Sequence, residues 1–224
     1  MIPLLHDFQG ERVLIFGGGA VGARKARRFG AEARVLVISP AFEAGPFDPT
    51  ERRHPDATVE LIRAAPGVEE VRSYVRRFEP SLVIAATDVR AINDAAADAA
   101  SAAGALVNRA DTHGGRSPGS VVVPATVRDG PVMAAVATGG RAPALSKHLR
   151  ERIEEVLAGA GGMAELLGPL RDQLQRGDMS PSARREAIRA VIADDTVWKH
   201  LGENTATARQ RAEHVVTDGS EDRQ

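Results

Sequence analysis

The sequence predicts an α/β fold, in which a doubly wound parallel sheet is followed by a β-hairpin segment and a small C-terminal helical domain. First, short apolar runs alternate with helical segments throughout residues 12–108, which is typical of a parallel sheet covered by helices. Second, two later apolar runs are separated by "RDGP", whose Asp129-Gly130 pair favours a hairpin turn. Third, apolar residues recur at helical spacing beyond residue 143.

The first part of the chain contains the elements of the expected sheet. Its apolar runs are short and nearly continuous, as expected of strands that are buried on both faces. A Pro-, Gly- and Asp-containing stretch after the second run is expected to be a loop. We expect strands at residues 13–16, 34–38, 58–62, 82–86 and 105–107, helices at 20–30, 68–78 and 91–103, and a loop at 41–56.

The second part is the hairpin, whose two strands are expected to be "SVVVPATV" at residues 120–127 and "VMAAVAT" at residues 132–138. A two-stranded hairpin is not stable alone in water. It must therefore pack against another surface, and a second copy of the chain is a natural candidate.

The third part is predicted to be helical. A first helix from Pro143 is broken by glycines at 159–162, a second covers 164–176, and a third covers 181–201 with Ser180 as its N-cap. The tail from Gly202 is polar and is expected to be loose by its end. Leucine and isoleucine recur at helical spacing, as a stripe on the first helix (Leu145, Leu149, Ile153, Leu157) and as inward residues on the second (Leu166, Leu167, Leu170, Leu174).

These readings divide the chain into a nucleotide-binding-like unit at residues 1–112, a hairpin segment at 113–142 and a helical domain at 143–224. The composition, with 43% hydrophobic and 26% charged residues over 224 positions, is that of a globular protein with a sizeable core. The formal net charge of −1 provides no overall field toward nucleic acid or an anionic membrane.

The residue types also exclude some classes of site and location. Cysteine is absent, which excludes disulfides, thiolate metal sites and cysteine nucleophiles. The first residues carry no cationic leader, and no apolar run approaches the roughly 20 residues of a membrane helix. We therefore expect a soluble, cytoplasmic protein with no membrane partner.

A glycine-rich turn gives the clearest functional signal. "GGGAVG" satisfies G-x-G-x-x-G directly after a predicted strand and directly before a predicted helix, which is the context of a dinucleotide fingerprint. In a Rossmann-like domain the first glycine makes the tight turn, the second lets the backbone approach a pyrophosphate, and the third lets the helix lie close to the sheet. The helix N-terminus then offers free N–H groups to the phosphates. We expect a cofactor of the NAD type to bind at Gly17, Gly19, Ala20, Val21 and Gly22; the alternative is a purely structural turn.

Further cofactor contacts are expected beyond the carboxyl ends of the other strands, where ligands of open α/β sheets gather. The acidic residue that usually ends the second strand is missing, because that strand runs into Ser39-Pro40. A serine can hydrogen-bond a ribose hydroxyl, and without a carboxylate a 2′-phosphate is not repelled, so NAD and NADP both stay open. Thr87, Asp88 and Asn108 follow later strands and complete the expected cofactor site.

The loop "NRADTHGGR" contains the candidate chemical groups. Asp111 is a candidate general base, and His113 could shuttle a proton or approach a metal. A loop carboxylate is more often a turn or cap residue, which is the alternative for Asp111.

Positive charge is concentrated in residues 108–150, which hold six Arg or Lys residues against two Asp residues, a net charge of +4. This favours a polyanionic ligand. Nucleic acid is disfavoured, because the segment has no aromatic side chain on which bases could stack. A small molecule with several carboxylates fits better, and a merely solvated rim is the alternative.

Five motifs in order carry a resemblance: "GGGAVGARKARR", "AATDVRAIN", "VNRAD", "VVVPATVRDGPVMAAVATGG" and "RAPALSKHLRERIEE". Over residues 2 to about 157 the chain resembles the precorrin-2 dehydrogenase/sirohydrochlorin ferrochelatase family of siroheme synthesis. The resemblance implies NAD-dependent oxidation of precorrin-2 to sirohydrochlorin, followed in many members by insertion of Fe²⁺ in the same cleft. It also implies a homodimer whose hairpin segments interlock.

The resemblance also implies roles for individual residues. Asp111 matches the family's catalytic aspartate in "N-x-x-D", and it would take a proton as hydride leaves toward the nicotinamide. Basic side chains would pair with the acetate and propionate groups of the tetrapyrrole. If iron is inserted, Asp111 and His113 are the candidate metal contacts. The expected substrate-binding residues are Arg109, His113, Arg116, Thr138, Gly139 and Arg141.

Three positions depart from the family pattern. Val89 stands where a second acid is common, Ala142 replaces the serine of "TGG-x-SP", and Gly22 stands where alanine is common. A rival function of another class is a regulatory module, in which NAD(H) binding sets the conformation of an oligomer. Such a module needs no base at Asp111 and no cleft for a polyanion.

Overall fold

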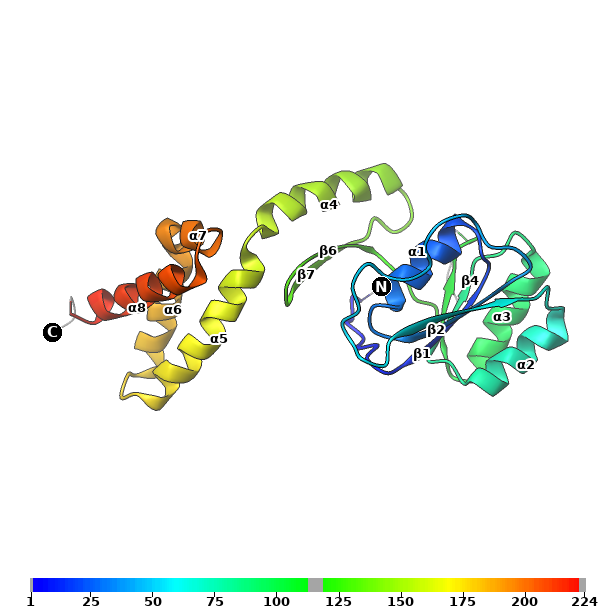
Figure 1. The fold of residues 1–224 in the computed structure, drawn as a ribbon, viewed down its shortest axis with the longest axis horizontal. Helices are drawn as coiled ribbons and strands as arrows, with labels where there is room; N and C mark the ends of the chain where they lie inside the picture. The colour runs from blue at the N-terminus through cyan, green and yellow to red at the C-terminus, as the bar shows by residue number, and fades with distance from the viewer. Residues whose placement is uncertain (1, 113–118, 222–224) are drawn as a thin grey trace. The chain divides into compact units, whose positions relative to one another are not determined.

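The computed structural model describes residues 2–112 and 119–221, with the side chains of 219–221 left out. The chain divides into two compact units, Met1–Val123 and Pro124–Gln224, which are described separately here (Figure 1). The hairpin and the helices share the second unit, so the boundary lies about ten residues later than the end of the predicted first domain. The three-part division stays a prediction about independent parts of the chain.

The first unit is built on a five-stranded parallel sheet with the order β3-β2-β1-β4-β5. After β3, at one edge, the chain crosses to β4 on the other side of β1, so the sheet has its topological switch point between β1 and β4. This confirms the predicted doubly wound sheet. Its elements are β1 (Arg12–Phe16), α1 (Ala20–Phe29), β2 (Arg34–Ser39), β3 (Thr58–Arg63), α2 (Val68–Phe78), β4 (Leu82–Ala85), α3 (Arg90–Ala102) and β5 (Leu106–Arg109).

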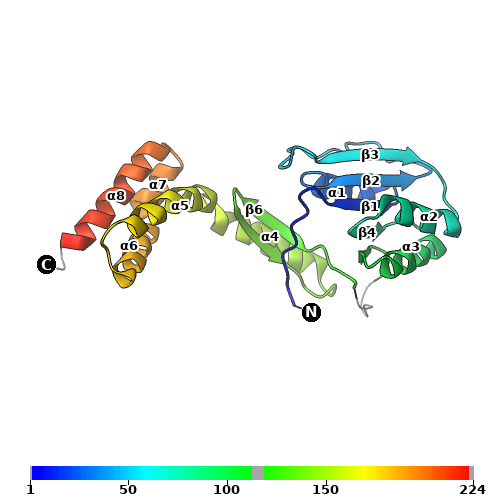
Figure 2. The same cartoon turned by 90° about the horizontal axis from the view of Figure 1, so that it is seen from below.

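Successive residues of the central strands point to opposite faces of the sheet, and both faces are buried. Val13 and Ile15 of β1 pack with Ala23 and Ala26 of α1, while Leu14 and Phe16 pack on the side of α2 and α3. Figures 1 and 2 show α1 on one side of the sheet and the α2–α3 pair on the other. Because both faces are covered by helices, the strands appear in the sequence as continuous apolar runs.

The chain pairs briefly with β5 after the loop that follows it, which corrects the expected extent of the hairpin. The Val107 N–H donates to the Gly119 carbonyl at 3.1 Å, and the Val121 N–H donates to the Val107 carbonyl at 2.7 Å. The Asn108 side-chain amide also donates to the Val121 carbonyl, at 2.8 Å. Residues 120–124 were expected in the first hairpin strand, but that strand begins only at Ala125, and Gly119–Val121 pair with Val107 of β5 instead.

The second unit starts with the predicted hairpin, β6 (Ala125–Asp129) and β7 (Val132–Val136), which are antiparallel and joined through Gly130 with φ +53°. Its helices are α4 (Pro143–Leu157), α5 (Ala160–Arg176), α6 (Pro181–Ala193), α7 (Asp195–Leu201) and α8 (Thr205–Glu221). Leu166, Leu170 and Leu174 are buried as predicted. The Ser180 hydroxyl accepts a hydrogen bond from the Ala183 N–H, so the predicted N-cap of α6 is confirmed.

One expectation for the C-terminal region is wrong, and one helix there was not expected. The single helix expected at 181–201 is interrupted at Asp194, whose carboxylate accepts from the Val197 N–H at 2.9 Å and so starts α7. Residues 205–221 of the polar tail form α8, because Ala208 and Ala212 are fully buried, and the last residues of the tail, 222–224, lie outside the described residues. Small alanines four positions apart let a largely polar helix approach the core closely.

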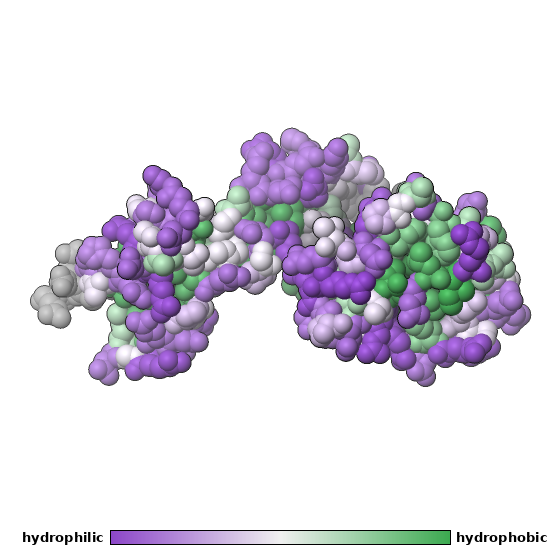
Figure 3. All heavy atoms as spheres, in the orientation of Figure 1, coloured by the Kyte–Doolittle hydropathy of each residue, from purple (hydrophilic) through white to green (hydrophobic). Residues whose placement is uncertain are grey.

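Helix α4 packs against β6 and β7 but contains no buried residue. Its predicted apolar stripe is partly exposed, with Leu145 48% and Leu149 38% accessible. Hydrophilic side chains cover much of the visible face of α4 in Figure 3. No helix in the described part of the chain is both long and apolar enough to cross a membrane.

Candidate functional site

The turn after β1 requires glycine at two of its positions. Gly17 has φ +119°, and a Cβ atom there would lie 2.3 Å from the Ala86 carbonyl oxygen. A Cβ at Gly22 would lie 2.0 Å from the carbonyl oxygen of Gly17. Glycine at these positions therefore lets the turn, the first helical turn of α1 and the end of β4 pack together.

The same turn leaves open space where a ligand would approach. A Cβ added at Gly19 would meet nothing within 4 Å among the described residues. Gly19 is also the N-cap of α1, with no side-chain cap and no acidic residue in the first helical turn. The positive end of the helix dipole and the first N–H groups of α1 are therefore presented without a competing carboxylate. This arrangement fits a pyrophosphate.

The segment after β2 packs directly on the glycine turn. Ser39 is buried, and a Cβ added at Gly18 would lie 2.8 Å from the Cβ of Ser39 and from Cδ1 of Phe42. Arg63, at the end of β3, pairs in register with Ser39 and donates to the Pro40 carbonyl at 3.4 Å. Our sequence reading identified Ser39 and Pro40 but missed Arg63, because only the strand register brings it beside them.

A buried asparagine fixes the loop after β4. The Asn93 side-chain oxygen accepts from the Thr87 N–H at 3.1 Å and from the Thr87 hydroxyl at 2.8 Å, while its amide donates to the Thr87 carbonyl at 2.8 Å. Thr87 is therefore held in place, while Asp88 is exposed. Asn93 was not predicted. Its signal is a single amide three and seven positions before Ala96 and Ala100, on the buried face of an alanine-rich helix.

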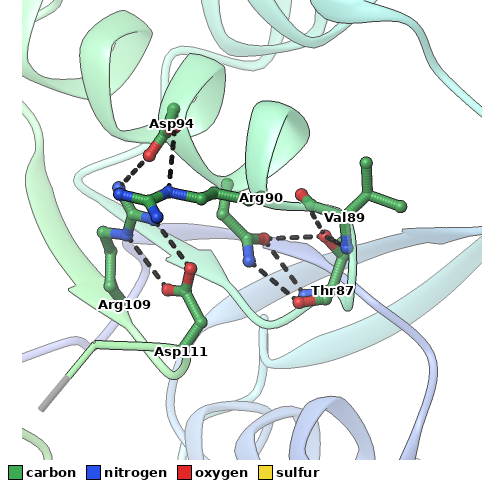
Figure 4. A network of polar contacts seen from close by, with 7 residues as sticks. Thr87, Val89, Arg90, Asp94, Arg109 and Asp111 are labelled. Carbon is green, nitrogen blue, oxygen red and sulfur yellow. Dashed lines mark hydrogen bonds and ion pairs between the residues drawn. The ribbon is translucent and has the colours of Figure 1, made fainter.

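The carboxylate of Asp111 is hydrogen-bonded to the guanidinium group of Arg109, the last residue of β5. Arg109 donates from Nε to Asp111 Oδ1 at 3.0 Å and from Nη2 to Oδ2 at 2.7 Å, so the contact involves two atoms on each side. The remaining terminal nitrogen of Arg109 donates to Asp94 on α3. Figure 4 shows Arg109 between the two carboxylates. Its side chain is 20% exposed, so Arg109 is partly shielded from solvent.

This contact shifts the pKa of both groups, in each case in favour of the charged form. The Arg109 hydrogen bonds lower the pKa of the Asp111 carboxyl below its usual value, against an opposing effect of partial burial and with help from the Asn93 amide. The same pair raises the pKa of Arg109. Asp111 is therefore held as a carboxylate at neutral pH, and it is a weaker base than a free aspartate for as long as Arg109 stays on it.

The strand register places the glycine turn and Asp111 together at the carboxyl ends of the parallel strands. Phe16 lies opposite Ala85, and Ala85 lies opposite Arg109, so β1, β4 and β5 end in one row. Neighbouring strands are about 4.8 Å apart, which separates the ends of β1 and β5 by roughly 10 Å. A dinucleotide with its pyrophosphate at β1 can reach over β4 toward the Asp111 loop.

The structure describes the surroundings of some of the other predicted site residues but not of all. The Asn108 amide nitrogen is engaged by Val121, and the Thr138 hydroxyl contacts the Ala142 carbonyl and Ser146 at the start of α4. Gly139 and Arg141 lie in the same turn. His113 and Arg116 lie outside the described residues. Substrate and cofactor contacts at all these positions stay predictions.

The predicted basic segment contains internal ion pairs. Arg109 contacts two carboxylates, and Arg150 pairs with Glu154 at 2.8 Å and with Glu151 at 3.6 Å. Much of its positive charge is therefore balanced locally. Within residues 2–112 and 119–221, no three His, Asp or Glu side chains gather as a metal site would require.

The fold and the glycine turn together define a dinucleotide-binding α/β protein, and comparisons with known proteins narrow this class. Residues 4–125 match a family described as putative NAD(P)-binding. Over 218 residues the chain is 30% identical to a precorrin-2 dehydrogenase of Methanosarcina barkeri, covering 96% of this chain and 93% of that one. It is also 34% identical over 215 residues to a siroheme synthase of Stutzerimonas stutzeri, covering 93% of this chain and 43% of that one. The chain belongs to the precorrin-2 dehydrogenase and siroheme synthase family, which confirms the resemblance seen in its motifs.

The relatives differ in length. The chain spans nearly all of the Methanosarcina protein but less than half of the Stutzerimonas siroheme synthase. Among solved structures, it superposes on SirC, a precorrin-2 dehydrogenase, with a TM-score of 0.65, 22% identity, and coverage of 96% of this chain and 100% of that one. The two proteins therefore share the fold of the sheet, hairpin and helices.

Proposed function

We propose that this chain oxidises precorrin-2 to sirohydrochlorin with a nicotinamide dinucleotide, NAD or NADP, as the hydride acceptor. The observation that carries this proposal is the similarity to a precorrin-2 dehydrogenase over nearly the full length of both chains. The open glycine turn and the carboxylate at the same edge of the sheet support it, because the reaction needs a seated dinucleotide and a nearby proton acceptor.

In this reaction the tetrapyrrole loses two electrons and two hydrogens, one as hydride and one as a proton. The bound dinucleotide supplies the hydride acceptor. Gly17, Gly19 and Gly22 shape the turn that receives its pyrophosphate, and Thr87, held by Asn93, borders the path toward β5. Asp111 takes the proton; it lies two residues beyond the end of β5, which ends in one row with β1 and β4.

Arg109 has a double role in this proposal. While it contacts Asp111 through two hydrogen bonds, protonation of that carboxylate would break a charge-assisted pair. The tetrapyrrole carries acetate and propionate groups, which compete for the same guanidinium. When a substrate carboxylate draws Arg109 away, the pKa of Asp111 rises and the group becomes a better base. The expected substrate contact of Arg109 and the base role of Asp111 are thereby linked.

The anaerobic formation of NADH from enzymatically generated precorrin-2 tests this function. Asp111→Asn is nearly isosteric and cannot accept the proton, so we expect kcat to fall by about 10²–10⁴-fold. Asp98→Asn is the matched control, because Asp98 is an exposed carboxylate of α3, and it should keep the parental rate. An Asp111→Asn protein that folds and turns over at the parental rate would remove Asp111 from the mechanism.

The same assay separates catalysis from the rival function, an NAD(H)-sensing module. A chain that binds dinucleotide but forms no NADH from precorrin-2 would favour the sensor. Insertion of Fe²⁺ into sirohydrochlorin stays a separate prediction. It is tested by the change in absorbance when Fe²⁺ or Co²⁺ is added to sirohydrochlorin with the protein, compared with a protein-free sample.

We also propose that the chain acts as a homodimer in solution. The exposed leucines of α4 and the small hairpin that α4 covers support this proposal, because apolar surface of this kind is commonly buried by a partner.

A further inference from the structure

We propose that the dinucleotide site of this chain has a subsite for the 2′-phosphate of NADP(H), formed by Arg63 beside the end of β2. The proposal deepens the proposed function and rests on its dinucleotide site. It concerns which form of the cofactor this chain accepts.

The end of β2 is the first part of the argument. In dinucleotide-binding folds an Asp or Glu there hydrogen-bonds the 2′-hydroxyl of the adenosine ribose and repels a 2′-phosphate. In this chain β2 ends at Ser39 and is followed by Pro40, so no carboxylate stands at that position. Ser39 is 6% exposed, and its Cβ lies against Gly18 of the turn that would hold the pyrophosphate. The ribose adjoining that pyrophosphate would therefore lie over this end of β2.

The second part is a guanidinium group next to that position. Arg63 ends β3, in register with Ser39. Its Nη1 donates to the Pro40 carbonyl at 3.4 Å, and its Cζ lies 5.7 Å from the centre of the Phe42 ring. Phe42 in turn lies close to the glycine turn, because a Cβ atom added at Gly18 would be 2.8 Å from Cδ1 of Phe42. The glycine turn therefore lies next to the end of β2, and the end of β2 lies next to Arg63.

The third part is that Arg63 is available for an anion. The side chain is exposed, and the structure records no ion pair for it with any carboxylate among residues 2–112 and 119–221. The stacking on Phe42 and the bond to Pro40 restrict the guanidinium, and the other donors of its planar fork stay free for phosphate oxygens.

The chemistry therefore favours a dianionic phosphate over a hydroxyl at this point. A guanidinium binds phosphate through charge-assisted hydrogen bonds, which are stronger than bonds to a neutral hydroxyl. Arg63 should strengthen the binding of NADP(H) and hardly affect the binding of NAD(H). It should also weaken as salt rises, because the group is exposed.

Direct binding measurements test this inference without requiring turnover. Dissociation constants for NADH and NADPH are measured by fluorescence titration at low and at moderate ionic strength, with the parent, Arg63→Gln and Arg63→Lys. For Arg63→Gln we expect NADPH affinity to fall about tenfold or more, with NADH affinity within about twofold of the parent. Arg63→Lys should recover part of the NADPH affinity, since it keeps the charge but loses the fork. Competition by 2′-phosphorylated AMP should follow the same order.

Arg76→Gln is the matched control, because Arg76 is an exposed arginine of α2 and the substitution changes the net charge equally. It should leave both dissociation constants at the parental values. If Arg63→Gln weakens NADH and NADPH equally, or weakens neither, the subsite is refuted while the dinucleotide site stands. If the parent binds neither nucleotide, the dinucleotide site itself is refuted, and the proposed function falls with it. Circular dichroism of each variant confirms that the fold is intact.

Discussion

At the scale of single residues, the contact between Arg109 and Asp111 determines how the proposed base behaves. Arg109 lowers the pKa of Asp111, so the carboxylate stays ionised to more acidic pH than a free aspartate would. Activity that needs the carboxylate is then lost only when the pH falls through this lowered pKa. The acidic limb of the pH profile consequently reports directly on the pair.

Arg109→Met is predicted to move that limb to higher pH, because the opposite charge that lowers the pKa of Asp111 is removed. The measurement is kcat/KM for NADH formation against pH, and KM should rise as well, because Arg109 is also proposed to bind substrate carboxylates. Arg90→Gln is the control, since Arg90 reaches the same Asp94 at 3.8 Å but does not contact Asp111. A raised KM with an unshifted acidic limb would leave Arg109 as a substrate contact alone.

Some of this site could be predicted from single residues and some could not. Gly17, Gly19 and Gly22 were identified because backbone geometry restricts the residue type, so the signal lies in the sequence itself. Asp111 was found through its motif. Its hydrogen bonds with Arg109 were not predicted, because whether two nearby charges meet depends on rotamers and on Asp94 from another element.

At the scale of elements, the junction between α6 and α7 depends on one side chain. Asp194 accepts from the Val197 N–H and also from Arg211 of α8, at 3.1 Å from Nε and 2.6 Å from Nη2. Asp194 is therefore the C-cap residue of α6 and the N-cap residue of α7, and its carboxylate also binds α8 through Arg211. The Arg211 contact lowers the pKa of Asp194.

Asp194→Ala is predicted to reduce the free energy of unfolding of the second unit by about 1–2 kcal/mol through loss of the cap. Because the folded pKa is lowered, the stabilisation is present above the unfolded pKa of about 4 and is lost as the pH falls further. Urea unfolding followed by the fluorescence of Trp198, in α7, should show the difference at pH 7 and a smaller one near pH 3. Asp178→Ala, at an exposed position, should change little, and an equally large effect there would contradict this account.

Element positions were predictable where burial imposes a period and less so where capping decides. Strands β1, β2 and β4 were located because both faces of the sheet are covered. The break at Asp194 was missed because the stretch 181–201 has helix-forming residues on both sides of it. Helix α8 was missed because its core contacts come from small alanines, which leave little hydrophobic signal.

At the scale of the whole molecule, the proposed homodimer gives a prediction about association. The parent should sediment as a dimer, and Leu149→Glu should shift the equilibrium toward monomer, because it places a charge in an exposed apolar stripe of α4. Analytical ultracentrifugation over a range of concentrations measures this. Arg152→Gln, also exposed on α4, should leave the association unchanged. A parent that sediments as a monomer at all concentrations would contradict the proposal.

The overall architecture was easier to predict than its division into units. Alternating strands and helices, a turn dipeptide and a helical end are local patterns, and each was found in the structure. The boundary at Val123 depends instead on backbone pairing of Val121 with Val107, a contact between distant positions that no local pattern records.

Because of this pairing, the two edge strands of the parallel sheet, β5 and β3, differ in whether another part of the chain pairs with them. Beside β5, the chain covers its own outermost strand with the stretch around Ser120. At β3, no described strand pairs with the outer edge, and Leu61 and Ile62 are 45% and 36% accessible; Figure 3 shows hydrophobic residues on the visible side of this unit. Bare outer strands are where foreign strands add. Misassembly of this sheet would therefore begin at β3, next to the arginine that we assign to the cofactor.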